Sequence, residues 1–179
     1  MRLSVTLVLT AFVLLVVSPM LWADSSGLWR LEISGGPGVT MGNRDRDGDY
    51  LLKGTVEYEI PTTPRLSLGL RMLPFFVYGQ DAPDADTVFG AGAGFGARLY
   101  SVRSEYRGLF AEVNAHVIGH ENRFVGNSSN INFLSGIGVG YKCSQSWHTV
   151  LKWEHISNAN LGEHNSGVDV VTLGLGYTF

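Results

Sequence analysis

The sequence predicts an all-β fold: an eight-stranded antiparallel transmembrane β-barrel of the outer-membrane type. Three observations predict it. Eight short runs alternate apolar and polar residues, short and long connections between the runs alternate strictly, and the composition combines 23 glycines with only 16% charged residues. Alternation with a period of two indicates two-sided strands, and such runs separated by turn residues are the signature of a membrane barrel.

The first 23 residues are expected to form a secretory signal peptide outside the fold. Arg2 gives a positive start, a strongly apolar stretch runs to Val17, and Ala23 offers a small residue for cleavage. Removing 23 of the 179 residues leaves 156, residues 24–179, which is enough for one domain. We therefore expect one barrel domain over 24–179.

The alternating runs begin near Leu28 and continue to the C-terminal Phe179. In order they span 28–34, 52–60, 65–72, 89–99, 109–117, 131–142, 147–154 and 171–179. One face is apolar in every run; in the first run it holds Trp29, Leu31 and Ile33. The other face is largely glycine in 89–99, 131–142 and 171–179, and polar or charged in the remaining runs. Eight is an even number and the smallest usual for a single-chain outer-membrane barrel.

The polar faces carry ten charged residues, five of each sign, that can pair with one another. They hold Arg30, Lys53, Arg71, Arg98, Lys152, Glu32, Glu57, Glu59, Glu112 and Glu154. These charges can pair inside an eight-stranded barrel, whose interior is just filled by side chains. We therefore expect the polar faces, with His116 and His148, to line the lumen and the apolar faces to meet lipid. Aromatic residues near strand ends are expected at the membrane interfaces: Trp29, Tyr100, Tyr141, Trp147, Trp153 and Tyr177.

The connections predict how the barrel is oriented. The short ones are 61–64, 102–106 and 143–146, and the longer, polar ones are 41–48, 80–86, 121–129 and 158–167. Short turns of such barrels face the periplasm and longer loops face the exterior, so both termini are expected in the periplasm. The terminal Gly-Tyr-Thr-Phe179 resembles the aromatic end signal of bacterial outer-membrane barrels.

Composition excludes several classes of function. Of 13 Lys and Arg residues, 12 remain after removal of Arg2, against 16 Asp and Glu, so residues 24–179 carry a formal charge of −4. No basic footprint for nucleic acid is present. Cys143 is the only cysteine, which excludes a disulfide within the chain and a cysteine cluster for zinc. We expect no metal and no cofactor.

Three residues near the C-terminus can form a nucleophilic triad, which is recognised by geometry and not by chain order: His155, Ser157 and Asp169. His155 and Ser157 share the lipid-facing parity of Trp153 in the seventh run. Asp169 shares the parity of Val171 in the eighth run, a hairpin neighbour. The three are thus expected to converge on the outer surface at the extracellular rim, where polar groups facing lipid are functional candidates.

The segment from His155 to Asp169 resembles the PagL family of lipid A 3-O-deacylases. The resemblance rests on His155-Ile-Ser-Asn158, then Asn165, Gly167 and an acidic residue that opens the last strand. It implies an eight-stranded barrel in the bacterial outer membrane that acts on lipid A of lipopolysaccharide. It also implies Ser157 as nucleophile, His155 as general base, Asp169 as the acid, and Asn158 and Asn165 as oxyanion or substrate-binding residues.

One residue departs from the family pattern. The family's acid is usually Glu, and the Asp169 side chain is shorter by one methylene, roughly 1.5 Å of reach. A hydrogen bond to His155 needs heavy atoms within about 2.6–3.2 Å. Two other functions stay open: a non-enzymatic outer-membrane barrel and an outer-membrane esterase acting on phospholipid. The oligomeric state stays open between a monomer and a homodimer.

Two further features are interpreted as having no catalytic role. Asp45, Asp47 and Asp49 have the spacing of a calcium loop, but position twelve is Val56, so we expect a solvated loop in which Arg44 and Arg46 could reach lipid A phosphates. His120 is expected in a loop.

Overall fold

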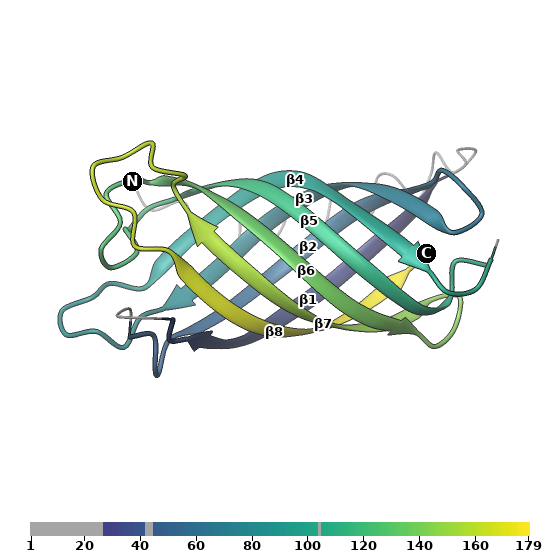
Figure 1. The fold of residues 1–179 in the computed structure, drawn as a ribbon, viewed down its shortest axis with the longest axis horizontal. Helices are drawn as coiled ribbons and strands as arrows, with labels where there is room; N and C mark the ends of the chain where they lie inside the picture. The colour runs from purple at the N-terminus through teal and green to yellow at the C-terminus, as the bar shows by residue number, and fades with distance from the viewer. Residues whose placement is uncertain (1–26, 42–44, 104) are drawn as a thin grey trace, which may run out of the picture.

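A computed structural model of the chain describes residues 27–41, 45–103 and 105–179. Within these residues eight antiparallel strands close into a barrel, each pairing with its neighbours in sequence and β1 with β8 (Figure 1). The strands are β1 (Leu28–Val39), β2 (Tyr50–Pro61), β3 (Leu66–Gly79), β4 (Val88–Tyr100), β5 (Gly108–His120), β6 (Ile131–Lys142), β7 (Trp147–Ser157) and β8 (Val168–Thr178). The predicted fold class is confirmed. The expected signal peptide, residues 1–23, lies outside the described residues.

The connections differ between the two ends of the barrel. Figure 1 shows the longer loops, including 158–167, at one end and the short turns with the C-terminus at the other. β1 to β6 have 12 to 14 residues, more than the roughly 9–11 that a tilted strand needs to cross a bilayer, so these strands continue past the hydrocarbon. Among the described residues, no helix is long and apolar enough to cross a membrane.

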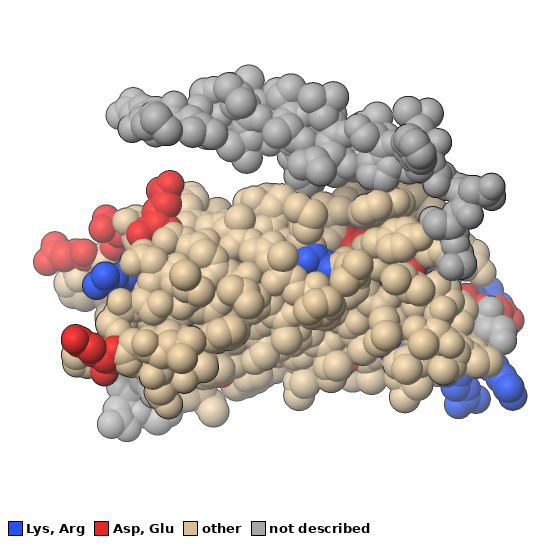
Figure 2. Space-filling model, turned by 90° about the horizontal axis from the view of Figure 1, so that it is seen from above, with Lys and Arg blue, Asp and Glu red and all other residues tan. Residues whose placement is uncertain are grey.

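The outer face of the barrel is apolar. Large side chains of the predicted lipid face are exposed, among them Phe95 (66%), Ile137 (64%) and Leu173 (63%). On the face seen in Figure 2, Asp, Glu, Lys and Arg gather at the two ends and the band between them is almost free of charge. Such a band is what lipid tails require, since charges at the bilayer midplane are costly.

The lumen is filled by the ion pairs that the sequence predicts. All ten charged residues of the polar faces are buried. Glu57 accepts from Arg71 Nε at 2.8 Å and from Arg98 Nη2 at 2.6 Å, and Lys53 Nζ donates to Glu154 at 2.7 Å. Each of these ten charges has a partner, which is the condition under which buried ions are tolerated.

The end of the lumen that lies near the longer loops contains an apolar cluster, which alternation alone does not predict. Phe76, Tyr78 and Phe124 pack there with aliphatic residues from most other strands. The third predicted run ends at residue 72, but β3 continues to Gly79 through an irregularity between Leu73 and Phe76. Pro74 lies inside this irregularity, because proline cannot donate to a strand ladder. The shift turns Phe76 and Tyr78 inward.

One predicted interfacial aromatic residue is placed wrongly. Tyr100 is only 1% exposed and lies in the lumen, where its hydroxyl donates to Glu59 at 2.7 Å. Its parity in β4 is that of the inward Arg98, so the period of two already assigns it to the interior. Tyr141, Trp147 and Trp153 are exposed at 49%, 47% and 37%, in agreement with the predicted outer face.

Candidate active site on the lipid-facing surface

The first contact of the candidate site joins β7 to β8. His155 and Asp169 are directly paired across the two strands, and His155 Nδ1 lies 2.9 Å from Asp169 Oδ1. A carboxylate accepts only, so Nδ1 carries the hydrogen and Nε2 of the neutral ring faces elsewhere as an acceptor. The shorter acid therefore reaches the histidine. The His155 side chain is 41% exposed, whereas Asp169 is only 12% exposed.

Ser157 is the last residue of β7 and lies on the same face as His155. Residues two apart in a strand are separated by roughly 6.6 Å along it, so both side chains can reach one ester carbonyl. In the described structure the Ser157 hydroxyl makes no hydrogen bond to His155. Hydrogen bonds between a nucleophile and its base are often long without substrate and shorten when substrate binds. The structure therefore brings His155 and Asp169 into contact and places Ser157 beside them.

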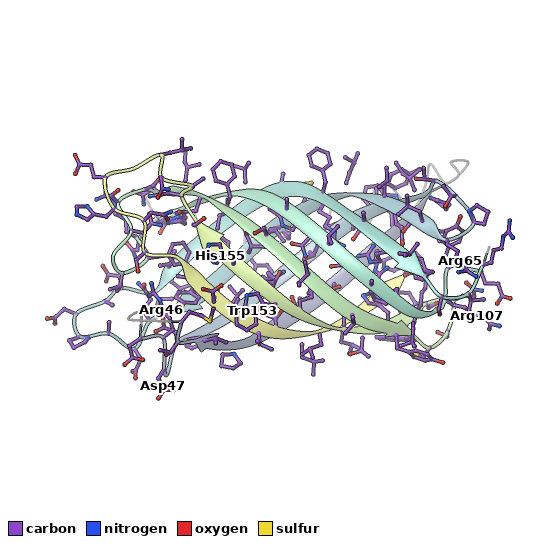
Figure 3. All side chains as sticks on the ribbon, in the orientation of Figure 1. Arg46, Asp47, Arg65, Arg107, Trp153 and His155 are labelled. Carbon is purple, nitrogen blue, oxygen red and sulfur yellow. The ribbon has the colours of Figure 1, made fainter. Side chains whose placement is uncertain are left out.

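An apolar groove of about 310 Å³ begins directly below these residues. It is lined by Ile137 and Val139 of β6, Leu151 and Trp153 of β7, and Val171 of β8, with Gly138 and Lys152. Ser135 pairs with His155, and the next outward pair down the same ladder is Ile137 with Trp153. Figure 3 shows His155 nearer the loop end of β7 and Trp153 nearer the middle of the barrel. The groove thus extends from the site toward the bilayer interior.

Asn158 and Asn165 organise the loop that follows Ser157. The backbone N–H of Asn158 donates to Asn165 Oδ1 at 3.0 Å, and Asn165 Nδ2 donates to Asn160 Oδ1 at 3.0 Å. Asn158 is fully buried and its Nδ2 donates to the His164 carbonyl at 2.8 Å. Ala159 and Asn160 have φ of 52° and 62°, so the chain reverses sharply after Ser157. The predicted oxyanion or substrate-binding roles of both asparagines stay predictions.

The expectation that Arg46 lies in a solvated loop is wrong. It is 4% exposed, and Nη2 donates to the Val125 carbonyl, the Ser166 hydroxyl and the Gly167 carbonyl at 3.1–3.3 Å. It therefore joins three loops, one of which leads directly into Asp169, and it does not point toward solvent. Arg44 lies outside the described residues. Asp45 and Asp47 are exposed as expected, and hydrogen bonds from the Asp47 N–H and the Thr40 hydroxyl lower the pKa of the Asp45 carboxyl.

No pattern in the sequence indicates three other residues near the site. Asn127 and Asn132 connect Asn158 to His120, which ends β5 and is not in a loop as expected. His120, Asn127 and Asn132 belong to one hairpin, and the pairing of β6 with β7 brings Asn158 to them from 31 residues further along the chain. Among residues 27–41, 45–103 and 105–179, no three His, Cys, Asp or Glu side chains are grouped so that they could hold a metal ion.

The closed barrel and the polar cluster on its outer face define a class of protein: an outer-membrane-type β-barrel with a candidate site exposed to lipid. Solved structures support the fold. A de novo designed transmembrane β-barrel has a TM-score of 0.55 and 15% identity, covering 87% of this chain and 98% of its own. The N-terminal β-barrel domain of Pseudomonas aeruginosa OprF has a TM-score of 0.55 and 16% identity, covering 86% and 99%.

The model of the family described as lipid A 3-O-deacylase (PagL) matches residues 57–178. The chain therefore belongs to the PagL family and is a β-barrel of the bacterial outer membrane. The match includes His155, Ser157 and Asp169, and it confirms the resemblance seen in the sequence. A search of curated proteins gave no match.

Proposed function

We propose that this protein is a serine esterase that hydrolyses the acyl ester at position 3 of lipid A and releases a 3-hydroxy fatty acid. One observation carries the proposal: the His155–Asp169 hydrogen bond of 2.9 Å beside Ser157, on a surface that faces lipid. Family membership supports lipid A as the substrate. A site on this surface meets only molecules of the outer leaflet, where lipid A resides.

The proposed reaction follows from the positions of the three side chains. His155 Nε2 takes the Ser157 hydroxyl proton while Oγ attacks the ester carbonyl, forming a C–O bond. The Asp169 carboxylate holds the imidazole tautomer and stabilises the imidazolium. The ester C–O bond to lipid A then breaks, and the proton passes from Nε2 to the departing lipid A oxygen. Water, activated by His155 in the same way, releases the fatty acid from Ser157.

The oxyanion of the intermediate needs a donor near Ser157, and we assign this role to Asn165. Its Oδ1 accepts from the Asn158 backbone N–H and its Nδ2 donates to Asn160 Oδ1, and the two bonds together fix the amide plane in the loop that follows Ser157. Asn158 thus contributes by orienting Asn165. In known cases one such donor contributes about 2.7–4 kcal/mol to catalysis.

The groove below the site suits the acyl chain of the substrate. Each methylene moved from water into an apolar environment contributes about 0.8 kcal/mol, but the bilayer already provides such an environment. The groove therefore acts mainly by orientation: it directs the chain toward Ser157 and keeps the ester at the membrane surface.

We also infer that residues 1–23 direct secretion, and a homodimer remains part of the proposal.

Mass spectrometry of lipid A from cells that express the chain tests the function. Loss of one 3-hydroxyacyl mass is expected with the unchanged protein and not with Ser157→Ala. Ser135→Ala is the matched control, because Ser135 pairs with His155 on the same lipid-facing surface. It should retain activity within about twofold, since no role in the reaction is assigned to it.

Other outcomes would replace the proposal. Activity lost in Ser135→Ala but kept in Ser157→Ala would make Ser135 the nucleophile. If lipid A is unchanged and fatty acid is released from phospholipid only when Ser157 is present, the protein is a phospholipid esterase. The groove is compatible with this outcome, because it contacts the acyl chain and not the headgroup. No hydrolysis of either lipid by folded, membrane-inserted protein would indicate a non-enzymatic barrel.

A further inference from the structure

A chain of side-chain hydrogen bonds leads from the end of β5 to the residue after Ser157. Asn132 Nδ2 lies 2.6 Å from His120 Nε2, Asn127 Nδ2 donates to Asn132 Oδ1 at 2.9 Å, and Asn158 Nδ2 donates to Asn127 Oδ1 at 3.2 Å. We call these four residues the His120 relay. Asn132 and Asn158 have no exposed surface, and Asn127 is 7% exposed.

The donors and acceptors of the relay follow one order, which the tautomer of His120 determines. His120 Nδ1 lies 2.6 Å from the Asn122 carbonyl, which can only accept, so Nδ1 carries the hydrogen. In a neutral ring Nε2 is then an acceptor, and Asn132 must present its Nδ2 to it. Asn132 Oδ1 consequently faces Asn127. Each amide in the relay is thereby fixed in a single orientation.

The far end of the relay reaches the candidate site. Asn158 follows Ser157 directly, and its backbone N–H orients Asn165. Its Nδ2 is shared between Asn127 on one side and the His164 carbonyl on the other. The orientation of the Asn158 amide therefore determines how the 158–167 loop lies against the strand end that carries Ser157.

We propose that His120, Asn132 and Asn127 are positioning residues for the ester hydrolysis, which hold Asn158 and the 158–167 loop in place while His120 is neutral. This inference rests on the proposed function. The three residues touch neither Ser157 nor the ester, so they act only through Asn158.

Protonation of His120 opposes this arrangement. With hydrogens on both ring nitrogens, Nε2 would be a donor that faces the Asn132 NH₂, which is also a donor. A flip of the Asn132 amide would place its NH₂ against the Asn127 NH₂, and a flip of Asn127 would do the same to Asn158. Among the contacts described for the His120 ring, no charged group would stabilise the added proton. These are Phe76 of β3, Phe124 and Asn122 of the 121–130 loop, and Asn132 of β6. Glu121, the next residue, is exposed.

The test compares two substitutions of Asn132 in the full chain, purified in detergent micelles with lipid A. Asn132→Leu removes the relay. Asn132→Asp keeps an oxygen that accepts from Asn127. Its second oxygen can only accept, so His120 Nε2 must carry a hydrogen and the ring becomes an imidazolium. The orientation of Asn127 and Asn158 is then unchanged. Asn114→Leu is the matched control, since Asn114 is a buried lumen asparagine whose side-chain atoms have no hydrogen-bond partner. The altered gel mobility of folded barrels verifies folding.

The relay predicts a specific pattern. Asn132→Leu should lower kcat about tenfold to hundredfold with KM changed less than about twofold, because buried donors lose partners without loss of the acyl groove. In the protein without substitutions, log kcat/KM should fall toward acid pH with a slope that approaches two, because His155 and His120 both bind a proton. Asn132→Asp should keep kcat within about threefold and show a slope of one.

Two results would overturn the relay: kcat of Asn132→Leu equal to that of Asn114→Leu, or a slope of two in Asn132→Asp. If Asn132→Leu does not fold, the Asp variant decides by its pH profile. If the unchanged protein does not hydrolyse lipid A, the proposed function fails separately, and exchange of the Asn158 backbone amide hydrogen decides. Faster exchange in folded Asn132→Leu than in Asn114→Leu supports the relay, and equal exchange overturns it.

Discussion

Replacing Asp169 by Asn tests the candidate triad most directly. The substitution keeps the size and planarity of the side chain, and an amide oxygen could still accept from His155 Nδ1. It removes the negative charge that stabilises the imidazolium formed when Ser157 loses its proton. An amide NH₂ can also turn toward Nδ1 and stabilise the wrong tautomer, which leaves Nε2 unable to accept a proton.

The magnitude follows from the distance and exposure of the pair. The Nδ1–Oδ1 distance is 2.9 Å, so the centres of the two charges lie about 4 Å apart. At that separation the attraction is about 4 kcal/mol near a protein surface and about 1 kcal/mol in water. Because His155 is 41% exposed and Asp169 only 12%, a value between these limits is expected. Asp169→Asn should therefore lower kcat about tenfold to thousandfold.

The assay is the initial rate of fatty acid release from lipid A in detergent micelles at neutral pH. Asp169→Glu is the matched control, because it restores the acid usual in the family and retains the charge. It should remain active, with the backbone absorbing the extra length. An Asp169→Asn variant that hydrolyses lipid A within about twofold of the unchanged rate would refute the role of Asp169 and leave His155 without its partner.

Three further predictions concern the surroundings of the site. Val139→Trp should fill the groove below Trp153 and misdirect the acyl chain away from Ser157, lowering kcat/KM about tenfold in the same assay; an unchanged value would separate the groove from catalysis. Arg46→Met should remove hydrogen bonds worth about 1.5–3 kcal/mol to the local stability of the loops, seen as faster hydrogen exchange at Ser166 and Gly167 but not in mid-strand; equal exchange would contradict the role given to Arg46. Glu154→Gln should leave Lys53 without a charged partner and cost about 3–5 kcal/mol in urea unfolding, whereas Lys53→Met with Glu154→Leu should recover much of it; a double variant less stable than the single one would contradict the ion-pair reasoning.

The sequence alone determined the barrel and the face on which the site lies. A period of two assigns each side chain to one face of a strand, and this local rule holds in the eight strands up to the irregularity in β3. The same rule placed His155, Ser157 and Asp169 together outside the barrel, because their parity matches Trp153 and Val171. It also assigned the ten lumen charges correctly. These features follow from neighbours in the chain and need no knowledge of distant contacts.

The tertiary structure decided what depends on contacts between distant segments. The irregularity at Pro74 turned Phe76 and Tyr78 inward, since one shift in register reverses every later side chain. Arg46 bridges loops more than seventy residues apart, and the His120 relay joins two strands and two loops. Whether the shorter Asp169 could reach His155 depended on the pairing of β7 with β8 and not on side-chain length. Hydrogen bonds are directional and short, so partners that share no local pattern become identifiable only when the folded chain brings them into contact, here at 2.6–3.3 Å.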